Sequence, residues 1–422
     1  MKTVTVVGLG YVGLPLACLL AKHRYDVFGY DINKEIVEST NIGKSHIKDD
    51  YLEKEVSSLK GKIKATTNPK DALSHSSIIV VCVPTPVDEN HLPNLKPLES
   101  ACKTIAKYLK KDDLVIIEST IAPGTCDEVV MPILETPGLK VNKDFYVVHC
   151  PERIDPGNKK YHLEDLPRVI GASNEKGLEL ASDFYTSIIK ANILKVSSLK
   201  TAEAVKIIEN SFRDINIAFV NELAKSFDKL GIDITEVIKG ASTKPFAFMP
   251  HWPGCGVGGH CISVDPYYLI DKAHKKGFEH EFLKLARSIN NSMPGYTISR
   301  AEEALSKIGK KITDVKISVL GVAYKKNVDD PRESPALELI HELKELACKF
   351  NVFDPYLPKY STVSSLQEAL DAECIIICTD HDLFTQIMPK QLKCIKVLID
   401  GRNCMDKKQL ENSGIIYRGI GR

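Results

Sequence analysis

Short runs of valine and isoleucine recur along the first half of the chain, separated by stretches with a helical pattern. The runs are TVTVVG (3–8), DVFGYD (26–31), SIIVVCVP (77–84), DLVIIEST (113–120), FYVVHCP (145–151) and PRVIGA (167–172). Continuous apolar runs of this kind are typical of parallel strands that helices cover on both faces. The pattern therefore predicts a parallel-sheet α/β domain over residues 1–195.

A different hydrophobic pattern occupies the middle of the chain. Between 201 and 231, apolar side chains recur every three or four residues, at positions 205, 208, 212, 215, 219, 223, 227 and 230. This spacing, without glycine or proline before Gly231, predicts one long amphipathic helix, and a second helix is expected over 267–290. A long helix between two α/β regions commonly serves as a connector or a subunit contact, so we expect a homodimer built around it.

The α/β pattern returns in the last third of the chain. The strand-like runs are VKISVLGVAY (315–324), FNVFDP (350–355), AECIIICT (372–379) and IKVLIDG (395–401), with a helix expected from Ser334 to Lys349. The predicted fold class is therefore α/β, with two Rossmann-like parallel-sheet domains joined by a helical region that contains the long central helix. The predicted boundaries are 1–195, 196–300 and 301–422.

Composition narrows the possible partners. The 422 residues include 56 Lys and Arg against 55 Asp and Glu, a balance that does not favour nucleic acid. The sequence has neither a signal-peptide layout nor an apolar run long enough for a membrane span, which predicts a cytoplasmic protein. Its twelve cysteines are scattered, without a CxxC pair, so we expect reduced thiols and no metal site.

The N-terminus carries a dinucleotide-binding pattern. Gly8, Gly10 and Gly13 form G-x-G-x-x-G directly after a predicted strand and before a predicted helix, and Asp31 closes the next strand. The glycines would admit the pyrophosphate to the helix N-terminus, and Asp31 would accept from the ribose hydroxyls. This predicts NAD in preference to NADP, although the cation of Lys34 could soften the preference. A glycine-rich turn without a ligand is the alternative.

A glycine-rich loop is the most unusual stretch of the sequence. PGCGVGGHCISVDP, which begins at residue 253, packs four glycines and two cysteines into fourteen positions. Three interpretations of Cys261 stay open: a buried small residue, a nucleophile with Asp265 handling protons, or a metal ligand. The metal site would draw on His251, Cys255, His260 and Cys261, whose spacing fits no zinc pattern.

Two polar residues lie beside the apolar stripe of the long helix. Lys206 and Asn210 are one turn apart and share a face. From spacing alone, the favoured interpretation is a solvated helix flank, and a lysine–amide pair that points into a cleft is the alternative.

Seven motifs in order carry a resemblance to a known family. They are GLGYVGLP (8–15), VCVPTP (81–86), ESTIAPGT (118–125), CPERIDPG (150–157), VKIIENSFRDINIAFVNE (205–222), GVGGHCISVDP (256–266) and GVAYKKNVDDPRESPA (321–336). Through them the chain resembles the UDP-glucose/GDP-mannose dehydrogenase family from end to end. STKPFAFMPHWPG (242–254) together with GGHC looks most like the bacterial UDP-N-acetylglucosamine 6-dehydrogenases, which supply surface polysaccharides such as O-antigen and capsule.

The resemblance implies an NAD-dependent four-electron oxidation at C6 of a UDP-sugar. Cys261 matches the family's nucleophile, which would hold the aldehyde as a thiohemiacetal and later form a thioester that water hydrolyses. Asp265 would handle protons. Lys206 and Asn210 would stabilise the charge that develops on the C6 oxygen.

The resemblance also implies roles for residues of the first domain. Thr120 would help to hold the hydrolytic water, and Glu152 would perform acid–base or water-positioning work. Glucose-specific relatives tend to carry a second glutamate four residues later, where this chain has Pro156. This departure favours an acetamido sugar and leaves both Glu152 and Asp265 as candidates for the hydrolytic base.

The remaining assignments concern ligand binding. By resemblance, the cofactor-binding residues are Gly8, Gly10, Tyr11, Val12, Gly13, Asp31, Thr85, Thr120 and Arg332. The substrate-binding residues are Glu152, Lys206, Asn210, Gly258, Lys325 and Arg402. Surface or interdomain ion pairs are the alternative for the three C-terminal cations.

The sequence therefore predicts a UDP-N-acetylglucosamine 6-dehydrogenase. A UDP-N-acetylmannosamine dehydrogenase is the first alternative, followed by an enzyme for UDP-glucose or UDP-N-acetylgalactosamine. A hypothesis of another class is a catalytically silent protein that binds a nucleotide sugar or NAD.

Overall fold

The computed structural model describes residues 2–88, 91–154 and 161–422. The chain divides into two compact units: Met1–Glu209 with Tyr267–Phe278, and Asn210–Pro266 with Glu279–Arg422. Each unit contains one β-sheet. The three-domain division at residues 195 and 300 stays a prediction.

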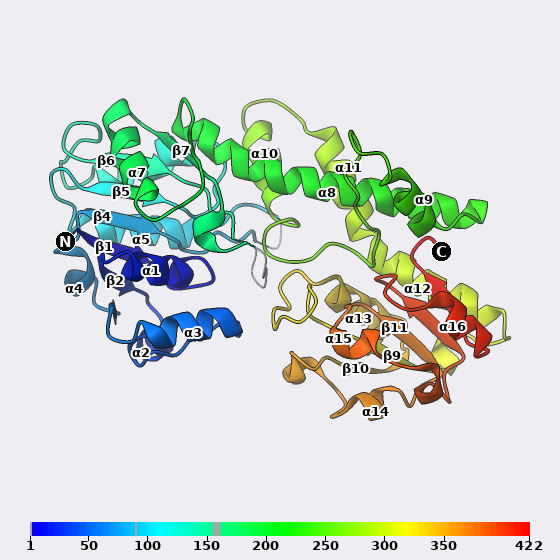
Figure 1. Ribbon diagram of the computed structural model, residues 1–422. Coiled ribbons are helices and arrows are strands. Elements are labelled where there is room, and N and C mark those ends of the chain that lie inside the picture. The colour runs from blue at the N-terminus through cyan, green and yellow to red at the C-terminus, as the bar shows by residue number, and fades with distance from the viewer. Residues whose placement is uncertain (1, 89–90, 155–160) are drawn as a thin grey trace. The chain divides into compact units, whose positions relative to one another are not determined.

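The sheet of the first unit has eight strands among the described residues, in the order β3-β2-β1-β4-β5-β6-β7-β8 (Figure 1). Its strands are β1 (Thr3–Val7), β2 (Asp26–Tyr30), β3 (Ile63–Thr66), β4 (Ile78–Val81), β5 (Leu114–Ile117), β6 (Tyr146–His149), β7 (Arg168–Ala172) and β8 (Ile193–Lys195). Its helices are α1 (Gly13–Lys22), α2 (Lys34–Asn41), α3 (Asp50–Ser58), α4 (Pro69–Leu73), α5 (Lys96–Ala106), α6 (Met131–Leu134) and α7 (Glu175–Thr186).

Alternating side chains of the central strands build a core on each face of this sheet. Val4 and Val6 of β1 pack into one cluster with residues of α1, α3 and α7, whereas Val7 packs into another with residues of α5 and α6. Burial on both faces explains why these strands are apolar without alternation. The fold class predicted from the apolar runs is confirmed.

Two strands depart from the predicted parallel sheet: β7, and β8, which runs parallel to β7. β6 and β7 pair antiparallel, with Val148 opposite Ala172 and His149 opposite Gly171. Within the described part of the connection, the regular structure is a short 3₁₀ turn, Leu163–Asp165, and a parallel pairing needs a full crossover, usually helical. The prediction of a parallel strand at 167–172 was therefore wrong in direction.

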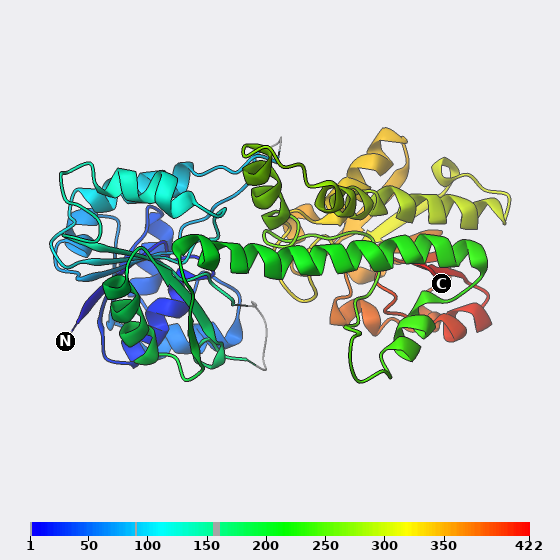
Figure 2. The same ribbon diagram turned by 90° about the horizontal axis from the view of Figure 1, so that it is seen from above.

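The middle of the chain is helical. The long helix is confirmed as α8 (Leu199–Leu230), which Figure 2 draws as one continuous rod, and α9 (Ile234–Ala241) and α12 (Met293–Ser306) accompany it. The single helix expected over 267–290 was wrong. The structure has α10 (Asp265–His274) and α11 (Glu281–Asn291), because a turn at Gly277, with φ of 84°, ends the first of them.

The apolar stripe of α8 lies at the surface. Ile208, Phe212 and Phe219 are 56%, 45% and 54% exposed, whereas polar residues such as Asp214 and Asn221 are fully buried. The helix is therefore amphipathic as predicted, but the rest of the chain packs against its polar face and leaves the apolar stripe exposed. None of the helices in the described part of the chain is long and apolar enough to cross a membrane.

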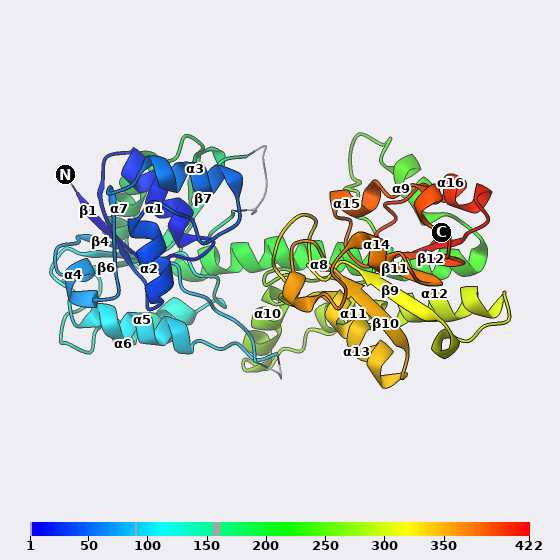
Figure 3. The same cartoon turned by 90° about the horizontal axis from the view of Figure 1, so that it is seen from below.

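The second unit has a parallel sheet of five strands among its described residues, in the order β10-β9-β11-β12-β13 (Figure 3). The strands are β9 (Lys316–Leu320), β10 (Lys349–Phe353), β11 (Cys374–Ile377), β12 (Val397–Asp400) and β13 (Ile416–Gly419). The helices are α13 (Pro335–Glu345), α14 (Leu366–Ala369), α15 (Asp382–Thr385) and α16 (Lys407–Asn412). Ser334, the predicted start of the helix, is the N-cap of α13.

Candidate active site

The turn after β1 has the geometry that the glycine pattern predicts. Gly8 has a φ of 89°, and a Cβ there would lie 2.7 Å from the carbonyl oxygen of Cys82. A Cβ on Gly13 would lie 1.8 Å from the oxygen of Gly8, so only glycine lets α1 start this close to the strand. A Cβ on Gly10 would meet nothing within 4 Å, which leaves open space at the turn for a pyrophosphate.

Asp31 is fixed against this turn. Its Oδ2 accepts from the backbone amide of Leu9 at 2.8 Å, and its Oδ1 accepts from the amide of Asn33 at 2.8 Å. The carboxylate is half-buried at the carboxyl end of β2 and keeps acceptor capacity for further donors. With Tyr11 and Val12 in the turn itself, these residues fit an NAD ribose and pyrophosphate.

The loops after β4 and β5 bring two threonines together. The hydroxyl of Thr85 donates to the backbone carbonyl of Thr120 at 2.7 Å, and the carbonyl of Thr85 accepts from the hydroxyl of Tyr268. Both threonines follow the carboxyl ends of neighbouring parallel strands. That edge is where open α/β sheets bind their ligands.

Glu152 is a buried carboxyl in the loop after β6. It is 7% exposed and accepts a hydrogen bond from the backbone amide of Ile154. Burial raises the pKa of Glu152 to about 7, although the charges of Lys206 and then Arg168 lower it. A carboxyl that titrates near neutral pH can take up and release a proton under working conditions, as a general base must.

Lys206 and Asn210 are both buried, at 8% and 6% exposure. The interpretation of this pair as a solvated helix flank was therefore wrong, because the polar face of α8 is the covered one. Asn210 Nδ2 donates to Asp265 Oδ2 at 2.5 Å, and Asp265 is itself 2% exposed. The amide of Asn210 thus fixes the orientation of the Asp265 carboxyl.

Cys261 begins a helical turn that leads into α10. Its carbonyl accepts from the amides of Asp265 at 2.8 Å and Val264 at 3.2 Å, while the residue itself is exposed. Just before it, the amide of Gly259 donates to the carbonyl of Arg332 at 3.0 Å. A Cβ on Gly258 would lie 2.6 Å from the carbonyl oxygen of Glu333, so this glycine allows the loop to pack closely. The interpretation of Cys261 as a buried residue was wrong.

The start of the glycine-rich loop is fixed by buried contacts. The amide of Gly254 donates to Asn221 Oδ1 at 3.0 Å, and the amide of Cys255 donates to the carbonyl of Gly401 at 2.9 Å. The Cys255 thiol is buried and donates to the carbonyl of Cys378 at 3.4 Å. Sequence reasoning missed Asn221, and a polar residue in the middle of a long helix was the signal that could have pointed to it.

The alternative of a metal site in this loop has no support. Among the residues that the structure describes, no group of three or more His, Cys, Asp or Glu side chains is arranged to hold a metal ion. His251 Nδ1 lies 3.1 Å from the carbonyl of Met249 instead.

The three predicted C-terminal cations lie in the second unit. Arg402 Nε donates to the carbonyl of Cys378 at 2.8 Å, and Arg332 Nη2 forms an ion pair of 2.6 Å with Asp330. Lys325 is half-buried in the loop after β9. Contacts of Lys325 and Arg402 to the UDP diphosphate or sugar, and of Arg332 to the cofactor, stay predictions.

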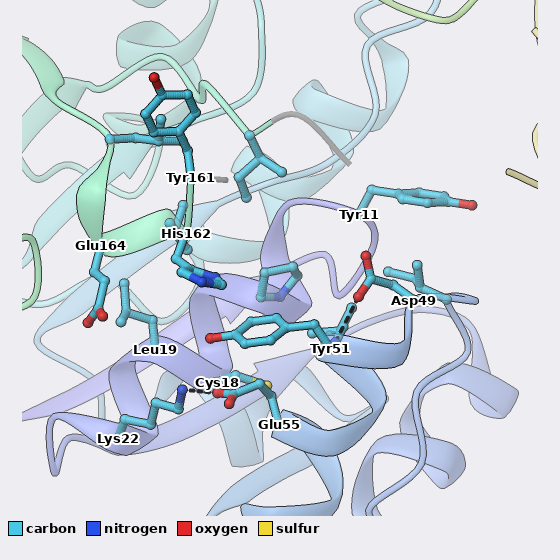
Figure 4. A pocket seen from close by; sticks show the side chains of 16 residues that line it. Tyr11, Cys18, Leu19, Lys22, Asp49, Tyr51, Glu55, Tyr161, His162 and Glu164 are labelled. Carbon is cyan, nitrogen blue, oxygen red and sulfur yellow. Dashed lines mark hydrogen bonds and ion pairs between the residues drawn. The ribbon is translucent and has the colours of Figure 1, made fainter. Parts of the chain in front are cut away.

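A pocket of about 130 Å³ lies between α1 and α3 in the first unit (Figure 4). The ring of Tyr51 lies 4.7 Å from that of His162 between centroids, tilted by 33°, and Lys22 forms an ion pair with Glu55. Ile154 and Tyr161 also line it, and residues 155–160 between them lie outside the described residues. The predicted specificity position Pro156 is among those residues, and the pocket itself contains none of the predicted catalytic side chains.

Comparison with known families matches three segments in order. Residues 2–189 match the NAD binding domain of the UDP-glucose/GDP-mannose dehydrogenase family, residues 200–292 its central domain and residues 318–407 its UDP binding domain. An NAD-binding domain followed by a UDP-binding domain defines an NAD-dependent UDP-sugar dehydrogenase. The chain belongs to the UDP-glucose/GDP-mannose dehydrogenase family.

Individual relatives align over most or all of the chain. The UDP-N-acetyl-D-mannosamine dehydrogenase of Pyrococcus horikoshii is 39% identical over 427 residues, 99% of each chain, and its solved structure superposes with a TM-score of 0.93. The UDP-N-acetyl-D-glucosamine 6-dehydrogenase of Pseudomonas aeruginosa is 42% identical over 84% of this chain and 83% of that protein. The UDP-N-acetyl-mannosamine dehydrogenase Cap5O of Staphylococcus aureus has a TM-score of 0.87 at 32% identity, over 100% of this chain and 98% of that one.

Proposed function

We propose that this protein oxidises C6 of a UDP-N-acetylhexosamine to the uronic acid, with UDP-N-acetylmannosamine as the first candidate substrate. Relatives that align over 99% or more of this chain, from Pyrococcus and Methanococcus, are named UDP-N-acetyl-D-mannosamine dehydrogenases. The glucosamine substrate predicted from the sequence becomes the second candidate, because the 42% identical Pseudomonas relative carries that name. Glucose is disfavoured, since the UDP-glucose dehydrogenase of Pyrobaculum islandicum is only 27% identical.

We infer that this chain's residues act on C6 through a covalent intermediate. Bound NAD+ would accept one hydride from C6 in each of two oxidations. The thiolate of Cys261 adds to the aldehyde carbon after the first oxidation, which keeps the aldehyde from leaving. The oxygen of that adduct is stabilised by the ammonium of Lys206 and the amide of Asn210. The second oxidation leaves C6 as a thioester on Cys261.

Hydrolysis of the thioester needs a base and a held water. Glu152 is the better candidate for the base, because its pKa of about 7 allows it to accept the water's proton near neutral pH. Asp265 remains the second candidate. Its Oδ2 already accepts from Asn210, so its carboxylate is suited to hold the loop and the amide in place. The C–S bond breaks as water adds, and Cys261 leaves as the thiolate.

One observation carries the proposal. Cys261 is exposed at the start of a turn that ends at Asp265. Asp265 is buried and accepts a hydrogen bond from Asn210, which is also buried. A merely structural cysteine has no need of such a fixed, glycine-bounded presentation.

The test is a panel of UDP-sugars with the NADH yield counted. We expect two NADH per molecule of UDP-N-acetylmannosamine, and loss of at least ~10³-fold in turnover for Cys261→Ser. Cys394, another exposed cysteine, provides the matched control, and Cys394→Ser should leave turnover unchanged. One NADH per sugar with free aldehyde, or no turnover of any sugar by the intact protein, would reject the four-electron mechanism. No turnover of any sugar is the result expected if the protein is a catalytically silent binding protein.

We also propose a homodimer that covers the apolar stripe of α8. Ile208, Phe212 and Phe219 form an exposed apolar row, which is unusual on a monomer. Phe212→Glu should therefore shift the protein toward monomer in sedimentation velocity, whereas Leu346→Glu, at an exposed apolar residue outside this row, should not. A wild-type protein that sediments as a monomer at micromolar concentration would refute the dimer.

The reaction is proposed to take place in the cytoplasm and to supply surface-polysaccharide synthesis. The described cysteines form no disulfide, which fits a reducing compartment.

A further inference from the structure

The first unit buries a charged cluster that has no part in the mechanism above. Glu118 follows β5 and is 1% exposed, Arg168 opens β7 and is 0% exposed, and Tyr185 on α7 is also 0% exposed. The three residues come from elements far apart in the sequence. Charged side chains are almost never buried this completely unless they are paired.

The pairing inside the cluster is incomplete. The Tyr185 hydroxyl donates to Glu118 Oε1 at 2.6 Å, and the Arg168 guanidinium lies 5.7 Å from the centre of the Tyr185 ring. Arg168 Nη1 and Glu118 Oε2 form an ion pair at 3.7 Å, which is longer than a hydrogen bond. Within the described residues, the three guanidinium nitrogens make no hydrogen bond. A pair built only for stability would form the bidentate bonds that offset the cost of burying it.

Arg168 and Glu152 lie at the same end of the β6–β7 pair. His149 is opposite Gly171 in this antiparallel pair, Glu152 is three residues beyond His149, and Arg168 is three residues before Gly171. Among the charges that face Glu152, Lys206 from α8 and Arg168 from β7 lower the pKa of Glu152, and Glu118 raises it. Arg168 on β7 and Lys206 on α8, both in the first unit, therefore oppose the effect of burial on the pKa of Glu152.

Among the described residues, two thiols also interact with Glu152. Cys82 follows β4 and Cys150 follows β6, and burial raises the pKa of both, that of Cys150 to about 12. They are therefore neutral at physiological pH. Besides burial, the charges that act on Glu152 from the described neighbours are those of Lys206, Arg168 and Glu118.

We propose that Arg168 is a positioning residue for Glu152, held by Glu118 and Tyr185 so that its unshared positive charge biases Glu152 toward the carboxylate. This inference rests on the proposed function for its catalytic meaning, since it explains how a buried Glu152 could be ionised to accept a proton. Arg168 touches neither the substrate nor the cofactor in this scheme. Glu118 limits the effect, because its negative charge offsets part of the guanidinium's.

The test measures the titration of Glu152 directly, in the full-length protein without ligands. Protein labelled with ¹³Cδ-glutamate would be titrated by NMR, with Glu152→Gln to assign the signal. Arg168→Met should raise the pKa of Glu152 by about 1 or more, because a nearby cation is lost. Glu118→Gln should lower the same pKa, because an anion is lost. Lys190→Met, which removes an exposed cation of the same unit, should leave it unchanged.

The opposite signs make the proposal falsifiable. If Arg168→Met and Glu118→Gln both leave the titration of Glu152 in place, or both move it in one direction, the positioning role is wrong. If Arg168→Met does not fold, Arg168→Lys keeps the positive charge and should leave the pKa of Glu152 in place. Glu118→Gln still tests whether loss of the anion lowers that pKa.

A second readout separates this inference from the proposed function. The lower pH limb of NADH formation should move up with Arg168→Met and down with Glu118→Gln. Shifts in the NMR titration without any UDP-sugar oxidation by the wild type would overturn the proposed function and leave the electrostatic role of Arg168 intact. If the wild type oxidises the UDP-sugar but neither variant moves the lower pH limb, the proposed role of Arg168 is wrong.

Discussion

The two sheets of this protein begin with the same local construction. In the first unit, Gly8 follows β1 with a φ of 89° and Asp31 closes β2. In the second unit, Gly321 follows β9 with a φ of 92° and Asp354 follows β10. In both units the aspartate accepts from backbone amides of the glycine turn. The two copies of this scaffold nevertheless treat the aspartate differently.

Asp31 is half-buried and makes two backbone hydrogen bonds. Asp354 is 1% exposed, and its oxygens accept from four backbone amides, those of Val322, Ala323, Tyr356 and Leu357, and lie 3.1 Å from His381 Nε2. Asp31 of the first unit could accept from a ribose hydroxyl, whereas Asp354, at the corresponding position of the second unit, is an internal structural acceptor. The Rossmann-like fold alone therefore does not predict a dinucleotide site, whereas the open glycine turn with an accessible aspartate does.

The two units also differ in the pKa of a buried carboxyl. Burial raises the pKa of Glu152 to about 7, whereas hydrogen bonds from His381 and two backbone amides outweigh burial and hold the pKa of Asp354 at about 2. A carboxyl with many donors is fixed as an anion and serves stability. A carboxyl with few donors can change its protonation state and serve chemistry.

The largest effect on stability should come from removing Asp354, the internal aspartate of the second unit. Asp354→Ala should lower the free energy of unfolding by about 4 kcal/mol, because several buried amides and His381 lose their acceptor. Chemical denaturation followed by circular dichroism measures this loss, and Asp354→Asn, which keeps one acceptor oxygen, should lose less. If Asp354→Ala unfolds within 1 kcal/mol of the wild type, the proposed division between a structural and a ligand-binding aspartate fails.

Glu152 should show the reverse, a carboxyl whose removal stabilises the protein at high pH. Because its pKa in the folded state is raised, the folded protein binds more protons than the unfolded one between about pH 4.5 and 7, and stability falls as the pH rises through that window. Glu152→Gln should therefore gain up to about 3 kcal/mol over the wild type at pH 8 and almost nothing at pH 4. Glu38→Gln, at an exposed carboxyl, is the control for a general charge effect. An equal gain at both pH values would mean that Glu152 is not the titrating group.

The features that sequence could predict are those recorded in local pattern. Buried parallel strands such as β4 and β11 are unbroken apolar runs, and the turn at Gly8 is written in its glycines. The edge strand β3 alternates buried and exposed residues, and β8 is only three residues long with mostly exposed side chains, so neither carries the apolar run that marks a central strand.

Other features depend on partners distant in sequence. Arg168 could be read only as a charge inside a strand, because Glu118 and Tyr185 reach it from other elements. The periodicity of α8 predicts an apolar face but not which face is covered, and the buried side proved to be the one with Lys206 and Asn210.

The accessible aspartate gives the third prediction. Asp31→Ala should weaken NAD+ binding about 10- to 100-fold in calorimetry, because a carboxylate acceptor for the ribose hydroxyls is lost, and should reduce discrimination against NADP+. Asp354→Asn should bind NAD+ as the wild type does, which separates the two aspartates by ligand affinity. An Asp31→Ala protein with unchanged NAD+ affinity would mean that the open turn is not the ribose site.

The smallest effect concerns the cation beside Asp31. The side chain of Lys34 is 83% exposed and lies 3.6 Å from Glu38, so water and salt screen its charge and Glu38 offsets it. Lys34→Gln should therefore change the affinity for NADP+ by less than about 3-fold at physiological ionic strength, whereas the same substitution in an Asp31→Ala background should reduce NADP+ binding more, because the repelling carboxylate no longer masks the attraction. Calorimetry with NAD+ and NADP+ on the two single variants and the double variant measures this coupling. A tenfold loss of NADP+ binding by Lys34→Gln alone would show that the cation, and not Asp31, sets the cofactor preference of the first unit.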